Sequence, residues 1–334
     1  MLVSVNYHYV GMGETPFSGI HGLSIQEFIR HVEWLRARFR LLGVADLFEL
    51  IEKGCVSEPS CVITFDDGLR CHYEPIYRIA REKNIPIIFF VSAGPLHDGK
   101  ATLVHKSQYL RAHTSPLDIS QHLESFLMDK AIDLDDLDND KVIAHYRYDD
   151  LNVAKVKFVL NYVLSEAQRR EFIDQRFSEL VPDERRFCRE WYLTEEEVKT
   201  MHCEMNCIGS HAWSHSPLGT LEEGDAKNEL LRSREILECV TGREVLGVSY
   251  PLGNEMAVSG RESVLAAEVG YRFGFTMERE VNRTLDDPLK LARLDCNDLP
   301  SVGKKPMFSE HEAGWVHHDR DQRLSGRRRY ILES

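Results

Sequence analysis

The feature that most constrains the fold of this chain is a strand–helix–strand pattern between residues 61 and 93. Residues 61–65 (CVITF) and 85–93 (IPIIFFVSA) are almost entirely apolar, and the apolar residues of 69–84 between them recur at helical spacing. Strands without polar alternation are typical of parallel sheets covered by helices on both faces. A helix is also the usual connection between two parallel neighbours. The stretch therefore predicts a β-α-β unit.

The same alternation continues on both sides of this unit. Residues 1–10 have the pattern of a strand, and residues 25–39 that of an amphipathic helix, with Ser24 and Glu27 as a capping box. Strand and helix in regular succession indicate one α/β sheet or barrel. The later strand-like and helical segments are 207–211, 224–242, 245–251, 262–270 and 271–277.

Residues 97–195 interrupt this succession. They are polar with helical patterns, which predicts a helical insertion or subdomain. Its acidic run at 133–140 lacks the glycine and final glutamate of a calcium loop and is interpreted as a solvated turn. We therefore divide the chain into a barrel (1–96 and 196–310), the insertion, and a basic tail (311–334).

Composition argues against several classes of partner. The net charge of −13 over 334 residues works against nucleic acid, because phosphates attract basic surfaces. No apolar run approaches the roughly 20 residues of a transmembrane helix, and the N-terminus lacks the pattern of a signal peptide. Eight cysteines without a CxxC pair indicate free thiols, so we expect a cytoplasmic protein. The basic tail predicts a solvated terminus, or a contact with a nucleotide, a lipid phosphate or a neighbouring subunit, through Arg320, Arg323 and residues 327–329.

Two adjacent carboxylates, Asp66 and Asp67, stand with Gly68 at the end of the first buried strand. An Asp-Gly hairpin turn would need an antiparallel strand directly afterwards, whereas a helical pattern follows. The carboxylates therefore lie at the carboxyl end of a parallel strand, where α/β folds bind ligands. Because neighbouring carboxylates repel each other, a cation or a proton is expected between them.

His211 and His215 follow another strand-like segment and are four residues apart. At that spacing two histidines share one face of a helical turn and can bind one metal ion. Together with a strand-end carboxylate they suit zinc or a similar first-row divalent ion. A closed structural zinc site that also uses His202, Cys203 and Cys207 is the alternative, although zinc fingers place about 12 residues between the cysteine pair and the histidine pair.

Residues 249–253 (SYPLG) form the third candidate feature. A Pro-x-Gly segment is typical of a rigid turn. Such a turn can direct backbone N–H groups at a developing oxyanion, and it can equally be a plain connection.

Together these stretches resemble the polysaccharide deacetylase pattern (NodB homology, carbohydrate esterase family 4). TFDDG at 64–68, GSHAWSH at 209–215 and SYPLG at 249–253 stand in the motif order of that family. The match covers residues 1–96 and about 190–300, and leaves the insertion outside. The resemblance implies an α/β fold, a distorted (β/α)7-type barrel, that removes N- or O-acetyl groups from sugars.

The resemblance also implies roles for individual residues. Asp66 looks like the general base, and Asp67, His211 and His215 look like ligands of Zn²⁺ or a similar ion such as Co²⁺ or Ni²⁺. Such an ion polarises the acyl carbonyl and lowers the pKa of a water molecule, whose proton the base takes. An oxyanion-binding N–H is implied at Leu252, in the loop formed by Tyr250, Pro251, Leu252 and Gly253.

The general acid departs from the common family pattern. The late Leu-x-x-His motif that usually supplies it is absent, and RLDCNDLP stands in roughly that region. Within the family, the biofilm poly-N-acetylglucosamine deacetylases take the acid histidine from an N-terminal Tyr-His strand end, to which Tyr7-His8 is similar. We therefore predict His8 as the acid; the alternative is a hydrogen-bonded strand-end histidine. His21 and His105 are the other candidates for the general acid. Asp295 or Asp298 would orient His8 or contact the substrate.

Two further departures concern the third motif. Many members have an arginine two residues before its proline, which helps to set the base, and here Ser249 occupies that position. Leu252 replaces the usual tyrosine after the proline. Neither change removes an expected metal ligand, so base tuning and substrate fit are the properties they affect.

The sequence thus predicts a metal-dependent hydrolase that removes an acyl group, most simply N-acetyl, from an amino sugar. Because the family mostly acts on polymers outside the membrane, the missing export signal favours a nucleotide- or lipid-linked precursor in surface-polysaccharide biosynthesis. The insertion would form a lid or a homo-oligomer contact. The alternatives are an amidohydrolase or deformylase for another small amide, and a catalytically idle domain that binds glycan or protein.

Overall fold

The computed structural model describes residues 1–12, 17–134, 137, 142, 151–255, 257–301, 308–311 and 314–317. Most of the acidic run at 133–140 and all five arginines of the basic tail lie outside these residues. The chain forms two compact units. The barrel unit contains Met1–Met12, His21–Gly99 and Arg189–Ser334, and the helical unit contains Gly13–Ile20 and Lys100–Cys188.

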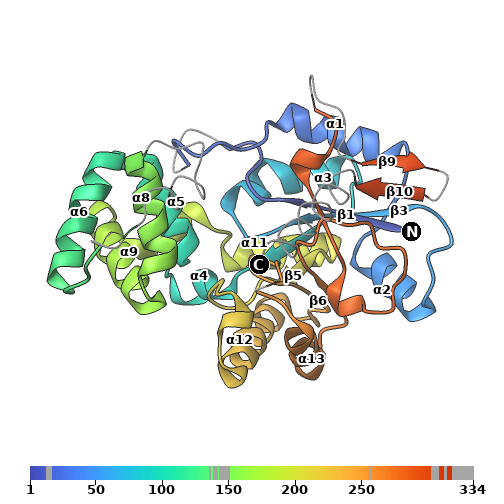
Figure 1. Cartoon of the computed structure of the whole chain (residues 1–334). Helices are drawn as coiled ribbons and strands as arrows, with labels where there is room; N and C mark the ends of the chain where they lie inside the picture. Colours follow the sequence, from blue (N-terminus) through green and yellow to red (C-terminus); the bar gives the residue numbers. More distant parts are fainter. Residues whose placement is uncertain are drawn as a thin grey trace. The chain divides into compact units, whose positions relative to one another are not determined.

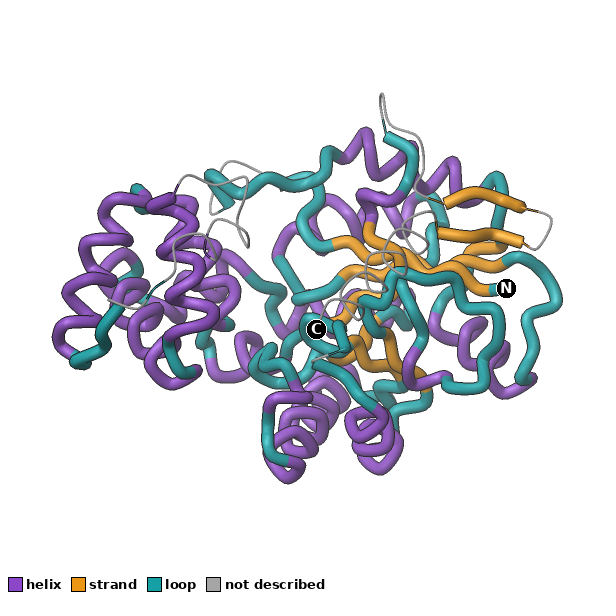
Figure 2. The backbone as a smooth tube through the Cα atoms, viewed as in Figure 1, coloured by secondary structure: helices purple, strands orange, loops and turns teal. Residues whose placement is uncertain are grey.

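A parallel sheet forms the centre of the barrel unit (Figures 1 and 2). Its strands follow one another in the order β7-β6-β5-β4-β3-β1-β8, and β2 pairs with the start of β3. Every pair in this sheet is parallel, so the carboxyl ends of the strands meet at one edge. The strands are β1 (Leu2–Tyr7), β2 (Arg40–Leu41), β3 (Ser60–Phe65), β4 (Ile88–Val91), β5 (Ile208–Ser210), β6 (Gly247–Ser249), β7 (Phe273–Phe275) and β8 (Leu294–Asp295).

One short segment, residues 291–295, joins the two edges of the sheet. At its start Leu291 pairs with Phe275 of β7, where its N–H donates to the Gly274 carbonyl at 2.8 Å. At its end β8 pairs with β1. The segment therefore closes the sheet into a distorted barrel, and the predicted α/β barrel is confirmed.

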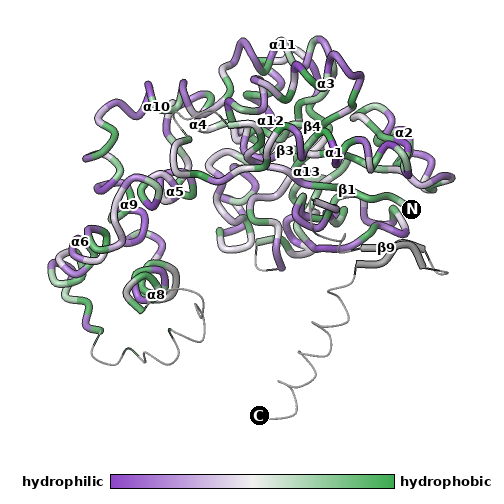
Figure 3. The backbone as a smooth tube through the Cα atoms, turned by 90° about the horizontal axis from the view of Figure 1, so that it is seen from above, coloured by the Kyte–Doolittle hydropathy of each residue, from purple (hydrophilic) through white to green (hydrophobic). Residues whose placement is uncertain are grey.

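Helices lie around the sheet (Figure 1). They carry both hydrophobic and hydrophilic residues, drawn green and purple in Figure 3. The Ser24 hydroxyl accepts a hydrogen bond from the Glu27 N–H at the start of α1, as predicted. In the described part of this unit the α-helices are α1 (Ile25–Arg36), α2 (Val44–Lys53), α3 (Arg78–Glu82), α4 (Ala93–Asp98), α11 (Glu195–Met205), α12 (Glu223–Thr241) and α13 (Gly260–Val269), and the short 3₁₀ helices are η3 (Leu218–Thr220), η4 (Pro288–Lys290) and η5 (Cys296–Asp298).

The helix predicted over residues 69–84 is interrupted. The structure has η1 (His72–Tyr77) followed by α3, and inside η1 the backbone of Glu74 is extended (φ −120°, ψ 110°). The cause is Pro75, because a proline ring disfavours the helical conformation of the residue before it.

The helical unit has a small apolar core of its own. Leu123 and Phe126 of α6 pack with Phe172 and Ile173 of α9. Its helices among the described residues are α5 (Leu103–His113), α6 (Pro116–Asp129), α8 (Leu151–Phe158), η2 (Val159–Val163) and α9 (Glu166–Leu180), followed by α10 (Glu184–Trp191), whose last residues belong to the barrel unit.

The unit boundaries differ from the predicted division into a barrel (1–96 and 196–310) and an insertion (97–195), since Gly13–Ile20 belong to the helical unit. Residues 97–99 and 189–195 belong to the barrel unit. In that unit the N–H of Leu193 donates to the Gly68 carbonyl at 2.8 Å, beside the predicted carboxylate pair. No helix among the described residues is long and apolar enough to cross a membrane. The remaining strands, β9 (Phe308–His311) and β10 (Gly314–His317), form an antiparallel pair.

Candidate active site

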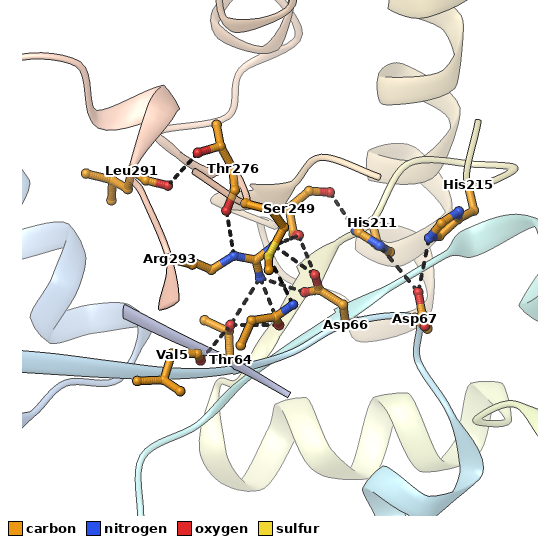
Figure 4. Close-up of polar contacts among 12 residues, drawn as sticks. Val5, Thr64, Asp66, Asp67, His211, His215, Ser249, Thr276, Leu291 and Arg293 are labelled. Atoms are coloured by element: carbon orange, nitrogen blue, oxygen red, sulfur yellow. Dashed lines mark hydrogen bonds and ion pairs between the residues drawn. The ribbon is translucent and has the colours of Figure 1, made fainter. Parts of the chain in front are cut away.

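The turn after β3 separates the two adjacent carboxylates. The N–H of Asp66 donates to the Tyr7 carbonyl at 3.0 Å, which continues the β1–β3 pairing by one residue. Asp67 (φ 81°) and Gly68 (φ 69°) then adopt left-handed backbone conformations. Figure 4 shows the result: Asp66 points toward Arg293 and Ser249, and Asp67 points toward His211 and His215.

The two predicted histidines lie in a loop after β5. The N–H of His211 donates to the Val91 carbonyl at 2.8 Å, and the backbones of Ala212 (φ 57°) and His215 (φ 63°) are left-handed. The prediction that the histidines share a helical turn is therefore wrong. Their rings nevertheless approach each other, with centroids 4.9 Å apart, because the left-handed residues fold the loop back.

Asp67, His211 and His215 form a group that can hold a metal ion. Nε2 of His211 lies 3.4 Å and Nε2 of His215 lies 3.2 Å from Oδ1 of Asp67. Three ligand atoms of this group lie within 4.8 Å of one another. One carboxylate with two imidazoles is a donor set that suits zinc and similar divalent ions.

The hydrogen bonding of His211 fits this use. Its Nδ1–H donates to the Ser249 carbonyl at 2.7 Å, which leaves Nε2 to act as a ligand. Burial alone would lower the pKa of His211, but Asp66, Asp67 and the Ser249 carbonyl together raise it. A bound cation would displace that proton, since metal and proton compete for one nitrogen.

The alternative structural zinc site does not form. The thiol of Cys207 lies 3.3 Å from the Met201 carbonyl, and Nδ1 of His202 accepts from the Ile208 N–H. Cys203 is exposed. Within the part of the chain that the structure describes, the one group of potential metal ligands is Asp67, His211 and His215.

Asp66 is held by an ion pair that the sequence analysis missed. Arg293 donates from Nη1 to Oδ1 of Asp66 at 2.9 Å and from Nη2 to Oδ2 at 2.8 Å, and the Ser249 hydroxyl donates to Oδ2 at 2.9 Å. Burial alone would raise the pKa of Asp66, but the Arg293 guanidinium lowers it to about 2, with smaller contributions from His211 and His8. Asp66 is therefore a carboxylate at neutral pH.

Arg293 lies on the segment that closes the barrel, and its side chain is completely buried. The sequence held only a weak signal for it. Arginine is almost never fully buried unless it is paired, but the segment LKLARL also contains Lys290, so its pattern does not show which cation is buried or which carboxylate it meets.

His8, the predicted acid, follows β1. Because Tyr7 pairs with Phe65 in the β1–β3 ladder, His8 and Asp66 leave the sheet side by side. The carbonyl of His8 accepts a hydrogen bond from Nε2–H of His72 at 2.9 Å. Burial lowers the pKa of His72 to about 4, so its ring is neutral and donates through this nitrogen.

The predicted loop after β6 has a constrained backbone. Leu252 (φ 60°) and Gly253 (φ 56°) are left-handed, and the Gly253 carbonyl accepts from the Met277 N–H at 2.8 Å. The side chain of Tyr250 is buried, whereas that of Leu252 is 50% exposed. Within the described part of the chain, the Leu252 N–H donates no backbone hydrogen bond.

The other predicted site residues have different surroundings. His21 is exposed. His105 is buried in the helical unit, where its Nδ1 lies 2.9 Å from the Thr102 hydroxyl. Asp295 accepts from the Asn297 N–H, and Asp298 accepts from the Asp295 N–H and pairs with Arg279 at 3.4 Å. These contacts brace a turn and do not involve His8.

The sequence matches the family model described as polysaccharide deacetylase over residues 53–156 and 131–274. None of the curated proteins compared with it matched.

Several solved structures have a similar fold. The deacetylase PplD of Streptococcus pyogenes, solved with acetate, aligns with a TM-score of 0.55 and 12% identity over 88% of this chain and 91% of its own. IcaB from Ammonifex degensii aligns with a TM-score of 0.52 and 15% identity over 88% and 90% of the two chains. A de-N-acetylase from Aggregatibacter actinomycetemcomitans has a TM-score of 0.51 and 14% identity over 88% and 95%.

Proposed function

Because the chain belongs to the polysaccharide deacetylase family, whose activity is the hydrolysis of acetyl groups on polysaccharides, we propose that it removes the N-acetyl group of an amino sugar. The reaction would take place where the strands β1, β3, β5 and β6 end. The main observation behind the proposal is that the two neighbouring carboxylates have different partners. Asp66 pairs with Arg293, and Asp67 lies with His211 and His215.

Asp67, His211 and His215 would hold the metal ion. When bound, a divalent ion polarises the acyl carbonyl and offsets the charge that develops on its oxygen. We propose zinc, with Co²⁺ or Ni²⁺ as substitutes, because the donor set has two nitrogens and one carboxylate.

Asp66 would accept the proton of the attacking water. A carboxylate kept ionised by Arg293 is always available as an acceptor, and its low basicity makes it release the proton again quickly. The N–H of Leu252 points to no other described backbone acceptor and would donate to the carbonyl oxygen as that oxygen becomes negative.

His8 would donate a proton to the leaving nitrogen. As the C–N bond breaks, the amine must be protonated, and acetate and a free amino sugar are the products. The position of His8 beside Asp66 at the end of β1 supports this role. A precursor substrate, the cytoplasmic location and a homo-oligomer stay predictions.

The test is acetate release by the zinc-loaded protein from N-acetylglucosamine oligomers, from a nucleotide-linked N-acetyl amino sugar, and from a formylated and a cyclic amide. We expect release from at least one acetylated sugar, its loss on chelation and its return with zinc. Asp66→Asn should lower kcat by about 100-fold or more, while Asp225→Asn, an exposed aspartate in the first turn of α12, should not change it.

The pattern of turnover distinguishes the proposed deacetylase from the two alternatives, an amidohydrolase or deformylase and a catalytically idle binding domain. Turnover of the formylated or cyclic amide alone would favour the amidohydrolase, and binding of oligomers without turnover would favour the idle domain. Full activity of Asp66→Asn would remove Asp66 from the mechanism.

A further inference from the structure

Asp66 is held by two residues from different segments of the barrel, Ser249 at the end of β6 and Arg293 just before β8. We infer that Arg293 and Ser249 act together as the positioning pair for Asp66, with the cation supplied by the barrel-closing segment while the third motif contributes only a hydroxyl. The inference rests on the proposed function, because it assigns a role in the same site.

The contacts of Arg293 fix its guanidinium completely. Nε donates to the Thr276 carbonyl at 2.9 Å, and Nη1 donates to Asn6 Oδ1 and to Thr64 Oγ1, both at 3.1 Å. These bonds come from β1, β3 and the end of β7. These bonds hold the guanidinium plane, and Nη1, which also faces Asp66 Oδ1, together with Nη2, which faces Oδ2, presents a fork that matches a carboxylate.

Ser249 connects the base to the metal ligands. Its hydroxyl accepts from Arg293 Nη2 at 2.8 Å and donates to Asp66 Oδ2, while its carbonyl accepts from Nδ1–H of His211. One residue at the end of β6 thus orients both Asp66 and His211. A displacement of Ser249 would therefore disturb both the Asp66 carboxylate and the His211 ring.

The small size of Ser249 is part of the arrangement. Its Oγ is already within hydrogen-bond distance of the Arg293 guanidinium, and both residues are fully buried. A longer side chain at this position would compete for the volume that the guanidinium fills. An arginine here would also place a second cation beside the first, where one buried carboxylate pairs with one charge. The serine and the arginine at 293 therefore form a matched pair.

The test uses four variants under saturating zinc: Ser249→Ala, Arg293→Ser, Ser249→Arg, and the exchange variant that combines the last two. We expect Arg293→Ser to lower kcat by about 100-fold, with KM changed less than about threefold. Ser249→Ala should lower kcat by about tenfold. The exchange variant should regain at least about tenfold over Arg293→Ser, because it returns one cation to the carboxylate, now from the end of β6.

Controls separate positioning from folding. Arg272→Ser removes an exposed arginine just before β7 and should leave kcat unchanged. Arg293→Lys keeps the charge but loses the fork, so it should fold and still have a reduced kcat. The inference is overturned if folded Arg293→Ser or Arg293→Lys keeps the wild-type kcat, or if the folded exchange variant is no more active than Arg293→Ser.

A crystal structure of Ser249→Ala or Arg293→Lys gives a readout that needs no activity. We expect the Asp66 carboxylate to leave its present position while Asp67, His211 and His215 keep theirs. An unmoved Asp66 contradicts the inference. Absence of acetate release by the wild-type protein would instead count against the proposed function, and the two failures are therefore distinguishable.

Discussion

At the scale of single residues, Asp66 and Asp67 differ because of the partners around them. Asp66 faces a buried guanidinium and Asp67 faces two imidazoles. The sequence predicted Asp67, His211 and His215 as one group, because strand-end residues of a parallel sheet meet at one edge. Arg293 was missed because its contact with Asp66 depends on barrel closure, which no local pattern encodes.

A prediction at this scale concerns His72. The change His72→Phe keeps the packing against Phe65 and Phe89 but removes the donor to the His8 carbonyl. We expect the free energy of unfolding to fall by about 1 kcal/mol, because the partly buried His8 carbonyl loses its partner.

The same variant should lower kcat, since His8 is the proposed acid. Chemical denaturation and steady-state kinetics measure the two effects. If stability falls while kcat and its pH profile stay as in the wild type, His72 supports the fold and not His8.

At the scale of elements, the strands were predictable and the loops between them were not. Unbroken apolar runs locate β3 and β4 because a buried parallel strand has no polar face. In contrast, Ala212 and His215 are left-handed although neither residue type signals that conformation. Such strain is tolerated where surrounding contacts impose it: Ala93 and Gly94 N–H donate to the carbonyls of Ala212 and Trp213.

Gly68 gives a prediction about the loop after β3. A Cβ at this left-handed position (φ 69°) would lie 2.8 Å from Cγ1 of Val91, so Gly68→Ala adds a clash to the backbone strain. Gly54→Ala is the matched control, because Gly54 has φ 67° and nothing within 4 Å of the added carbon. We expect the control to cost about 1 kcal/mol of unfolding free energy and Gly68→Ala to cost about 2–4 kcal/mol.

Only Gly68→Ala should also weaken zinc binding, because Asp67 precedes the displaced residue. Calorimetric titration of the metal-free protein with zinc measures this. Equal zinc affinities in the two variants would show that the Asp67 carboxylate is independent of the turn.

At the scale of the whole molecule, the barrel and the helical unit each have a hydrophobic core. The barrel interior is unusual in one respect: it holds an ion pair among Asn6, Thr64 and Ser249. Breaking a buried ion pair by removing one partner costs several kcal/mol, because the other charge stays buried. Most of the fold could be predicted from alternating strands and helices, whereas this polar centre required the closed barrel.

Acid sensitivity is the prediction at this scale. Burial, and secondarily Arg243, lowers the pKa of His202 from 6.5 to about 4. Between these pH values the unfolded chain binds the proton and the folded protein does not. The stability contributed by neutral His202 is therefore complete above pH 6.5 and is lost as the pH falls toward 4.

His202→Asn retains an acceptor for the Ile208 N–H and cannot titrate. We expect the variant to lose about 2 kcal/mol less unfolding free energy than the wild type between pH 7 and pH 5. Urea unfolding at the two pH values measures the difference. Parallel pH dependences would show that His202 is protonated in the folded state.

The barrel-closing segment has a consequence for how the protein is made. During synthesis, Asp66, Asp67, His211, His215 and Ser249 leave the ribosome before Arg293 does. A nascent chain that stops short of residue 291 carries every proposed metal ligand and the base, yet lacks the counter-charge and the last rung of the sheet. Activity therefore depends on completion of the barrel, and premature termination products should be inactive rather than partly active.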